Sequence, residues 1–325
     1  MKRKRIKAAV CAAVMAFTLF GSLCPVDYHF MRETSVTASA EAAIWDGTED
    51  TSWYYREHDV IVSENGERIA IFNIRTAEEL AGLAKLVRNG NSMKNTMINL
   101  VSDVTLNDTT NFDNWDEQPP ANNWTAIGAV PIEAPNVNVV MTTQPECRNT
   151  VFAGMFNGNG HTISGMYSLH HNYAGLFART SGIITNVIVK DSYIQCINTQ
   201  KVESGDTALW EACAGGITAI CDRGVISHCE FDGKIFASGL NQVGYGTHGS
   251  FAGGIVGKFS DDENGVAAVV MMFALVPAGF LINPALFLTA SGQQVITDPG
   301  IYSCINRGSI YTEHGTDENG AGGII

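Results

Sequence analysis

The chain has 325 residues, of which 45% are hydrophobic and 16% charged, and its formal net charge at pH 7 is −13. Because binding to phosphates depends on Lys and Arg, this acidic balance excludes nucleic acid as a partner. The eight cysteines contain no Cys-x-x-Cys pair, which excludes zinc-ribbon and thioredoxin-type sites.

Residues 1–40 contain the three parts of a secretory signal peptide in order. Five basic residues within the first seven positions precede an apolar stretch at 8–23, and Ala38-Ser39-Ala40 supplies a cleavage motif. The apolar stretch is short for a membrane span of about 20 residues, which favours cleavage over a retained anchor. Cys24 leaves lipidation as an alternative, which bulky Leu23 disfavours. We therefore predict a secreted or cell-surface protein, whose mature chain keeps 31 acidic and 14 basic residues and a charge of −17.

Residues 41–150 are predicted to form an N-terminal cap region and the first strands. A turn is expected at Asn65-Gly66. Thr76 and Glu79 have the spacing of a capping box, and Asn89-Gly90 supplies a helix stop. Between them the apolar residues that share one helical face are Leu80, Leu83, Ala84 and Val87. Strand-like runs follow at 97–101 and 104–106, so this amphipathic helix is expected to cap the apolar end of a strand stack. Residues 107–150 are predicted to form an irregular loop excursion. The Asn-Gly-Asn-Gly run at 157–160 is predicted to form two turns.

The second half of the chain, residues 151–325, repeats one phrase. Its four copies are Ala174-Gly175-Leu176-Phe177, Ala214-Gly215-Gly216-Ile217, Ala252-Gly253-Gly254-Ile255 and Ala321-Gly322-Gly323-Ile324. A second phrase has three copies, which begin at Gly182, at Gly224 and at Ile301. The second and third copies are followed by a Gly-x-Ile motif, at 233–235 and at 308–310. A repeat of this length indicates a solenoid, propeller or array.

The spacing of the repeats locates an insertion. Gly175, Gly215 and Gly253 lie 40 and 38 residues apart, whereas Gly253 and Gly322 lie 69 apart. The extra residues fall between the Gly-Gly-Ile strand and the Ile-x-x-Cys strand of one repeat, at about 266–295. Residues 266–290 carry no charge but include Pro277 and Pro284, so we predict one or two short helices that pack on the solenoid flank or a partner. A membrane-inserted hairpin, with membrane contact through 266–290, is the alternative.

Short Ile- and Val-rich strands with glycines at the bends predict an all-β fold, a right-handed parallel β-helix in which like residues of successive coils form columns. A β-propeller is the alternative. Cys229 and Cys304 occupy the same repeat position, which favours a buried column of free thiols over disulfides. The other cysteines after residue 40 are Cys147, Cys196, Cys213 and Cys221.

Several of these motifs resemble a known family. The helix at 74–90, the Trp-x-x-Ile-Gly motif at 124–128, the Phe-x-Gly-x-Phe-x-Gly-Asn-Gly-His motif that begins at Phe152 and the Gly-Gly-Ile-Val-Gly phrase resemble the GLUG-repeat family of bacterial secreted and cell-surface proteins. The resemblance covers about residues 70–325 and implies a β-helical stalk, often adhesin-like. The family also occurs beside the catalytic part of immunoglobulin A-cleaving metallopeptidases. No His-Glu-x-x-His motif is present, so no protease activity is carried over.

The candidate chemical residues have structural explanations that outweigh functional ones. The acidic runs at 261–265 and 317–320, and the acids Asp108, Asp113, Asp116 and Glu117, are expected to be solvated turns and not calcium ligands. His170 and His171 point to opposite strand faces and are expected to be a surface or turn pair. His228 and Cys229 also point to opposite faces, and His161 is expected in a turn. Core packing is favoured over a carbohydrate platform for Trp45, Trp53, Trp115 and Trp124.

The function predicted from these observations is a non-catalytic surface scaffold or adhesin-like protein that binds host or environmental glycans or proteins through its loops. The alternative is a β-helical polysaccharide lyase or glycosidase, which needs carboxylates converging on one sheet face. No catalytic, cofactor-binding or metal-binding residue is assigned. Because the chain stops inside a fresh repeat, we also expect it to be truncated at its C-terminus.

Overall fold

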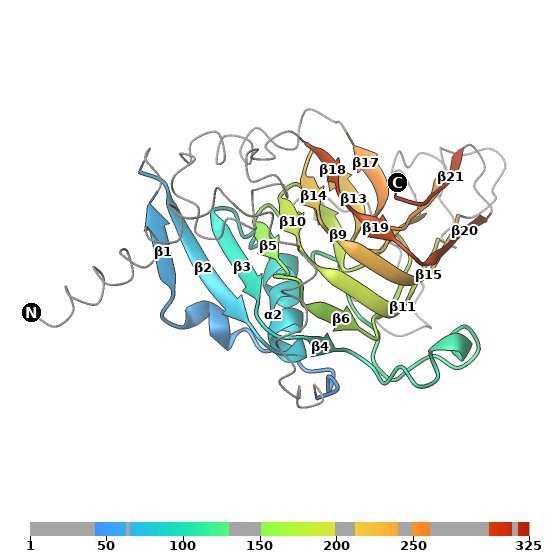
Figure 1. The fold of residues 1–325 in the computed structure, drawn as a ribbon, viewed down its shortest axis with the longest axis horizontal. Helices are drawn as coiled ribbons and strands as arrows, with labels where there is room; N and C mark the ends of the chain where they lie inside the picture. The colour runs from blue at the N-terminus through green and yellow to red at the C-terminus, as the bar shows by residue number, and fades with distance from the viewer. Residues whose placement is uncertain are drawn as a thin grey trace, which may run out of the picture. The chain divides into compact units, whose positions relative to one another are not determined.

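The computed structural model describes residues 43–62, 66–129, 151–198, 212–239, 249–260, 299–313 and 318–324. These residues form mainly β-strands in sheets rich in parallel pairs, with α2 (Ala77–Arg88) as the α-helix among them (Figure 1). The predicted all-β class is therefore confirmed. The predicted signal peptide and Cys147 lie outside the described residues, and so do residues 261–298, which contain the predicted apolar helices.

The described strands belong to four sheets. The first sheet has the order β1 (Asp59–Val62), β2 (Arg68–Ile74), β3 (Thr96–Leu100), β5 (Met155–Asn157), β10 (Ile183–Thr185), β14 (Val225–Ser227) and β18 (Gly300–Tyr302). The second contains β4 (Val104–Thr105), β6 (Thr162–Ser164), β7 (Tyr167–His170), β11 (Ile188–Ile197), β15 (Glu230–Ser238), β19 (Ile305–Asn306) and β20 (Ser309–Glu313). The third contains β8 (Tyr173–Ala174), β12 (Ala212–Gly215), β16 (Gly249–Gly253) and β21 (Glu318–Gly322). The fourth contains β9 (Phe177–Thr180), β13 (Thr218–Asp222) and β17 (Val256–Ser260).

Each repeat visits the third, fourth, first and second sheets in that order. The four copies of the repeated phrase pair in parallel, and their alanines share one register position: Ala174, Ala214, Ala252 and Ala321. The second phrase behaves in the same way, because Ile184 pairs with Ile226 and Ile226 with Ile301. The pairing of repeats that the sequence predicts is thus present, strand by strand.

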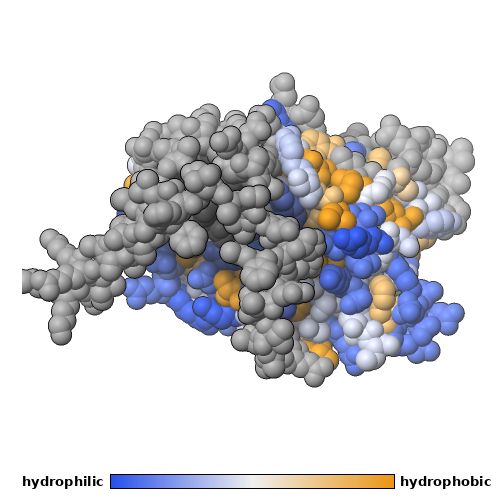
Figure 2. All heavy atoms as spheres, in the orientation of Figure 1, coloured by the Kyte–Doolittle hydropathy of each residue, from blue (hydrophilic) through white to orange (hydrophobic). Residues whose placement is uncertain are grey.

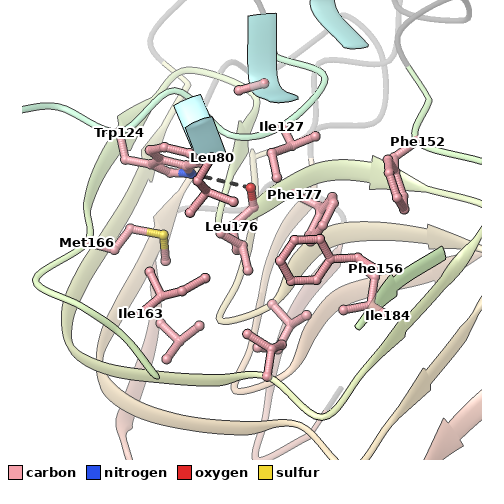
Figure 3. Packing of buried hydrophobic residues seen from close by; sticks show 14 of the residues in the cluster. Leu80, Trp124, Ile127, Phe152, Phe156, Ile163, Met166, Leu176, Phe177 and Ile184 are labelled. Atoms are coloured by element: carbon pink, nitrogen blue, oxygen red, sulfur yellow. Dashed lines mark hydrogen bonds between the residues drawn. The ribbon is translucent and has the colours of Figure 1, made fainter. Parts of the chain in front are cut away.

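The interior is lined by every second residue of these strands. In the first sheet the inward column contains Phe72, Ile98, Phe156, Ile184, Ile226 and Ile301. Figure 3 shows Phe156 and Ile184 packed with Phe177 from the fourth sheet. Burying such a side chain contributes about 1.5–3 kcal/mol relative to leaving it exposed, so the column is a main source of stability.

The helix α2 packs its apolar face against this same core. Thr76 accepts a hydrogen bond from the Glu79 backbone N–H at 3.2 Å, as the capping pattern predicts. In a full capping box the Glu79 side chain would accept from the backbone N–H of Thr76. Here its carboxylate accepts from the backbone N–H of Arg75 at 2.7 Å. Gly82 lies where a Cβ would come within 1.9 Å of the Asp50 carbonyl oxygen, so glycine lets the helix approach the preceding segment, which includes η2 (Ser52–Tyr55).

The bend between the first and second sheets uses a left-handed residue in each repeat. Asn186, His228 and Ser303 have φ values of 53°, 53° and 52°. Each is followed by an inward residue, and two of these, Cys229 and Cys304, are the cysteines that the repeat places in one column. In the described residues all five cysteines are free, which confirms the prediction of buried thiols for four of them, while Cys304 is half-buried.

Two local features differ from the sequence-based predictions. The run at 157–160 forms a single turn between β5 and β6, because Asn157 ends β5. β1 and β2 pair in antiparallel fashion on either side of Gly66, whereas the sequence pattern predicted a turn alone at Asn65-Gly66; Asn65 lies outside the described residues. The insertion lies between β17 and β18, as the spacing of the repeats predicts, whereas two residues suffice at this point in the preceding repeats (181–182 and 223–224). Figure 2 shows hydrophobic residues at the surface around β18 and β19, where Ile305 is 44% exposed.

Candidate functional site

The outer face of the second sheet carries a strip of aromatic and polar side chains, which we call the aromatic strip. Strand alternation turns Ile194, Ile235 and Ile310 into the core and their neighbours outward. One outward register column contains Leu169, Gln195, Phe236 and Tyr311, and the adjacent column contains Tyr167, Tyr193, Lys234 and Ser309. These residues form the aromatic strip.

Two pairs of rings stack along the strip. Tyr167 and Tyr193 have ring centroids 5.7 Å apart and planes inclined by 17°, and Phe236 and Tyr311 have centroids 5.5 Å apart and planes inclined by 15°. The first pair is buried, whereas Tyr311 is 57% exposed. The strip therefore offers an accessible aromatic ring at its Tyr311 end.

The excursion after β4 covers the other end of the strip. Trp115 packs edge-on against Tyr167 with centroids 6.1 Å apart, beside η3 (Phe112–Asn114). The Lys234 ammonium lies 5.1 Å from the centre of the Phe112 ring and donates to the Asp113 carbonyl oxygen at 2.8 Å. These contacts hold the excursion against Tyr167 and Lys234.

Acidic groups of the excursion lie next to the strip. Burial, together with the nearby charge of Asp116, raises the pKa of the Tyr193 hydroxyl, so Tyr193 is a neutral donor at pH 7. Asp108 accepts a hydrogen bond from the Thr110 backbone N–H at 2.9 Å, which lowers the pKa of Asp108. Asp108 thus stabilises a turn, as the sequence predicts.

Several carboxylates elsewhere pair with cations. Asp222 is buried and pairs with Arg179, and Glu230 accepts from Arg307 at 2.8 Å. Glu49 contacts Lys85 and Arg88, and although burial acts to raise its pKa, these two partners lower it overall. Among the residues that the structure describes, no group of three or more His, Cys, Asp or Glu side chains could hold a metal ion. The acids at 261–265 lie outside those residues, as do the side chains of 317–320.

Three of the described histidines make structural contacts: His161, His170 and His171. His170 is buried, contrary to a surface position, and its Nδ1 accepts from the backbone N–H groups of Asn172 and Tyr173 at 3.1 Å. His171 is half-buried, with its Nδ1 3.1 Å from the Ile197 carbonyl oxygen. His161 contacts Asp103 at 3.0 Å, beside its turn.

The four tryptophans considered as a carbohydrate platform are all in the interior, with exposed fractions of 1–7% for Trp45, Trp53, Trp115 and Trp124. Core packing is confirmed for them. The exposed aromatic pair was not predicted, although its sequence signal exists: Phe236 and Tyr311 each follow directly on a Gly-x-Ile phrase. The equivalence of the two positions becomes evident once β15 and β20 pair in register.

Comparison with protein-family models, with curated proteins and with solved structures found no match. Within the described parts of the chain, no helix combines the length and the apolar character that a membrane span requires.

Proposed function

We propose that this chain is an exported, non-catalytic surface scaffold of adhesin-like type, built as a right-handed parallel β-helix with α2 as its N-terminal cap. The β-helix is supported by the parallel, in-register pairing of strands one repeat apart and by the identical bends at Asn186, His228 and Ser303. Propeller blades are antiparallel, so the parallel pairs favour the β-helix. Export rests on the signal-peptide pattern at 1–40 and on the resemblance to GLUG-repeat proteins.

The proposed ligand is an extracellular glycan of neutral charge, bound at the aromatic strip. The single observation that carries this proposal is the stacked pair of Phe236 and Tyr311 on an open sheet face. An aromatic ring offers an apolar surface to a sugar, and the neighbouring Gln195 amide and Tyr311 hydroxyl can hydrogen-bond its hydroxyl groups. An anionic glycan would be repelled by the acidic chain.

A scaffold explains the acidic side chains better than a glycosidase does. Glycosidic cleavage uses two carboxyl groups that face each other across the scissile bond, about 5–10 Å apart. Asp222 and Glu230 face the outside of the strand stack, but each pairs with an arginine. Arg179 and Arg307 come from the repeats next to the one that contains Asp222 and Glu230, so these ion pairs link neighbouring repeats.

The test is a glycan array followed by calorimetric titration of the glycan that binds. Tyr311→Ala should weaken binding about tenfold or more, since a central aromatic anchor contributes at least about 1.4 kcal/mol. The control is Tyr55→Ala, which removes an aromatic residue that is 76% exposed outside the strip. Equal affinity of the two variants would refute the strip as the binding site, and an array without any bound glycan would refute the glycan ligand.

A further inference from the structure

A second apolar cluster lies on the outer face of the first sheet. Its register column contains Ile71, Met97, Met155, Ile183 and Val225, and each member is the neighbour of an inward core residue. Ile69 and Tyr302 also pack there. The sheet is therefore apolar on both faces, as a sheet is when both faces are covered.

Four of the five residues of this outer column are almost completely buried, and Ile71 is half-buried. Met97, Met155 and Ile183 are each 3% exposed, and Val225 is 6% exposed. Every described apolar side chain of the cluster belongs to the first sheet itself. A face of this kind exposed to water would be an interaction site or an aggregation risk, so the identity of its cover matters.

The polar residues of the adjacent outward column form hydrogen bonds within the sheet, so a segment that covers them need not supply hydrogen-bond partners. Asn157, Thr185 and Ser227 lie on the same outer face and are 0%, 0% and 3% exposed. Asn157 donates to Asn99 Oδ1 at 3.3 Å, and Ser227 donates to Thr185 Oγ1 at 2.9 Å. Because these groups bond to one another along the stack, an uncharged apolar segment can lie on them without leaving them unsatisfied.

We propose that residues 266–290 of this chain cover the outer face of the first sheet. Three observations carry the inference. The insertion leaves after β17 and re-enters at Gly300, which pairs with Val225 and so continues this column. Residues 266–290 carry no charge. The competing segment 130–150 also enters near this sheet but contains Glu133, Glu146 and Arg148.

The cover makes the insertion part of the fold and gives its apolar residues an intramolecular partner. A lipid bilayer and a second copy of the chain are the other occupants that such a segment could have. They are distinguished by which atoms lie next to the outer column.

The direct test places a diazirine amino acid at single positions of the full exported chain. Ile183 and Val225 point outward, and their neighbours Ile184 and Ile226 point into the core and serve as matched controls. We expect photocrosslinks from the two outward positions to peptides of 261–298, and none from the controls. Crosslinks from the outward positions to residues 130–150, to residues 1–40, to lipid or to an isotope-labelled second copy would overturn the proposal.

A deletion provides an independent readout. Residues 261–299 are replaced by Arg-Gly, the connection that the preceding repeat uses at 223–224. Peroxide should then oxidise Met97 and Met155 about tenfold faster, whereas the core residue Met166, which is 0% exposed, keeps its rate. Unchanged protection of Met97 and Met155 would contradict the proposal. If Met166 also reacts faster, the variant is unfolded and the crosslinks in the full chain decide. Glycan binding at Tyr311 does not enter either readout, so this inference can fail separately from the proposed function.

Discussion

Asn157 is the centre of a polar ladder, and its replacement by alanine should be costly. Its side-chain oxygen accepts from the Asn159 backbone N–H at 3.0 Å and from Asn186 Nδ2 at 3.4 Å. Its amide nitrogen donates to Asn99 Oδ1 at 3.3 Å. Asn157 is 0% exposed, so water cannot replace these bonds in the folded protein.

The expected loss follows from the number and burial of these bonds. Each lost hydrogen bond costs about 1 kcal/mol net, and a buried donor left without its acceptor costs about 1–3 kcal/mol. Asn157→Ala should therefore lower the free energy of unfolding by about 2–4 kcal/mol. Asn99→Ala is the comparison variant. Asn99 is half-buried, and the Asn157 amide that loses Asn99 as an acceptor keeps Asn159 Oδ1 at 2.5 Å, so this change should cost about 1–2 kcal/mol.

The assay is urea unfolding at neutral pH, followed by tryptophan fluorescence. Three of the four described tryptophans are buried in the main core and Trp115 is buried beside the aromatic strip, so their fluorescence reports unfolding of the N-terminal part of the strand stack. The denaturant dependence of the free energy should be equal for the two variants, since the same surface is exposed on unfolding. If Asn157→Ala costs no more than Asn99→Ala, the ladder does not stabilise the stack and the reasoning is refuted.

Three further predictions concern thiols, glycines and pH. Burial raises the pKa of Cys221 to about 12, whereas a hydrogen bond with Cys229 lowers the pKa of Cys304, so iodoacetamide should modify Cys304 first, as peptide mapping would show. Modification of Cys221 first would be inconsistent with this. Gly233→Ala should destabilise by about 3 kcal/mol or more, because its Cβ would lie 2.1 Å from the Ser192 carbonyl oxygen, whereas Gly323→Ala meets no atom within 4 Å and should be neutral in urea unfolding. The folded pKa of Glu49 is lowered, so the stabilisation by its ion pairs is present above its unfolded pKa of about 4.3 and is lost as the pH falls through the folded pKa. Glu49→Gln should remove that part of the pH dependence of stability, which is worth less than about 1 kcal/mol. An unchanged dependence of stability on acid pH would contradict the assignment.

The local sequence determined those features that depend on neighbours along the chain. The helix that begins after Thr76 follows from its cap and its apolar spacing, since both act within one or two turns. The repeat determined which strands correspond, because equivalent phrases need equivalent neighbours. The position of the insertion between β17 and β18 follows from counting residues between those phrases.

Only the tertiary structure decided what lies on each face. Trp115 and Tyr311 are both aromatic residues in polar surroundings of the sequence, yet Trp115 is 2% exposed and Tyr311 57% exposed. The difference arises because the excursion after β4 packs on the second sheet, more than 50 residues away in sequence, and no local pattern encodes that contact. The outer column of Met97 and Met155 is a second case. Alternation predicts which residues share a face, but the burial of that face depends on segments that fold back over it, which the composition of a single strand does not specify.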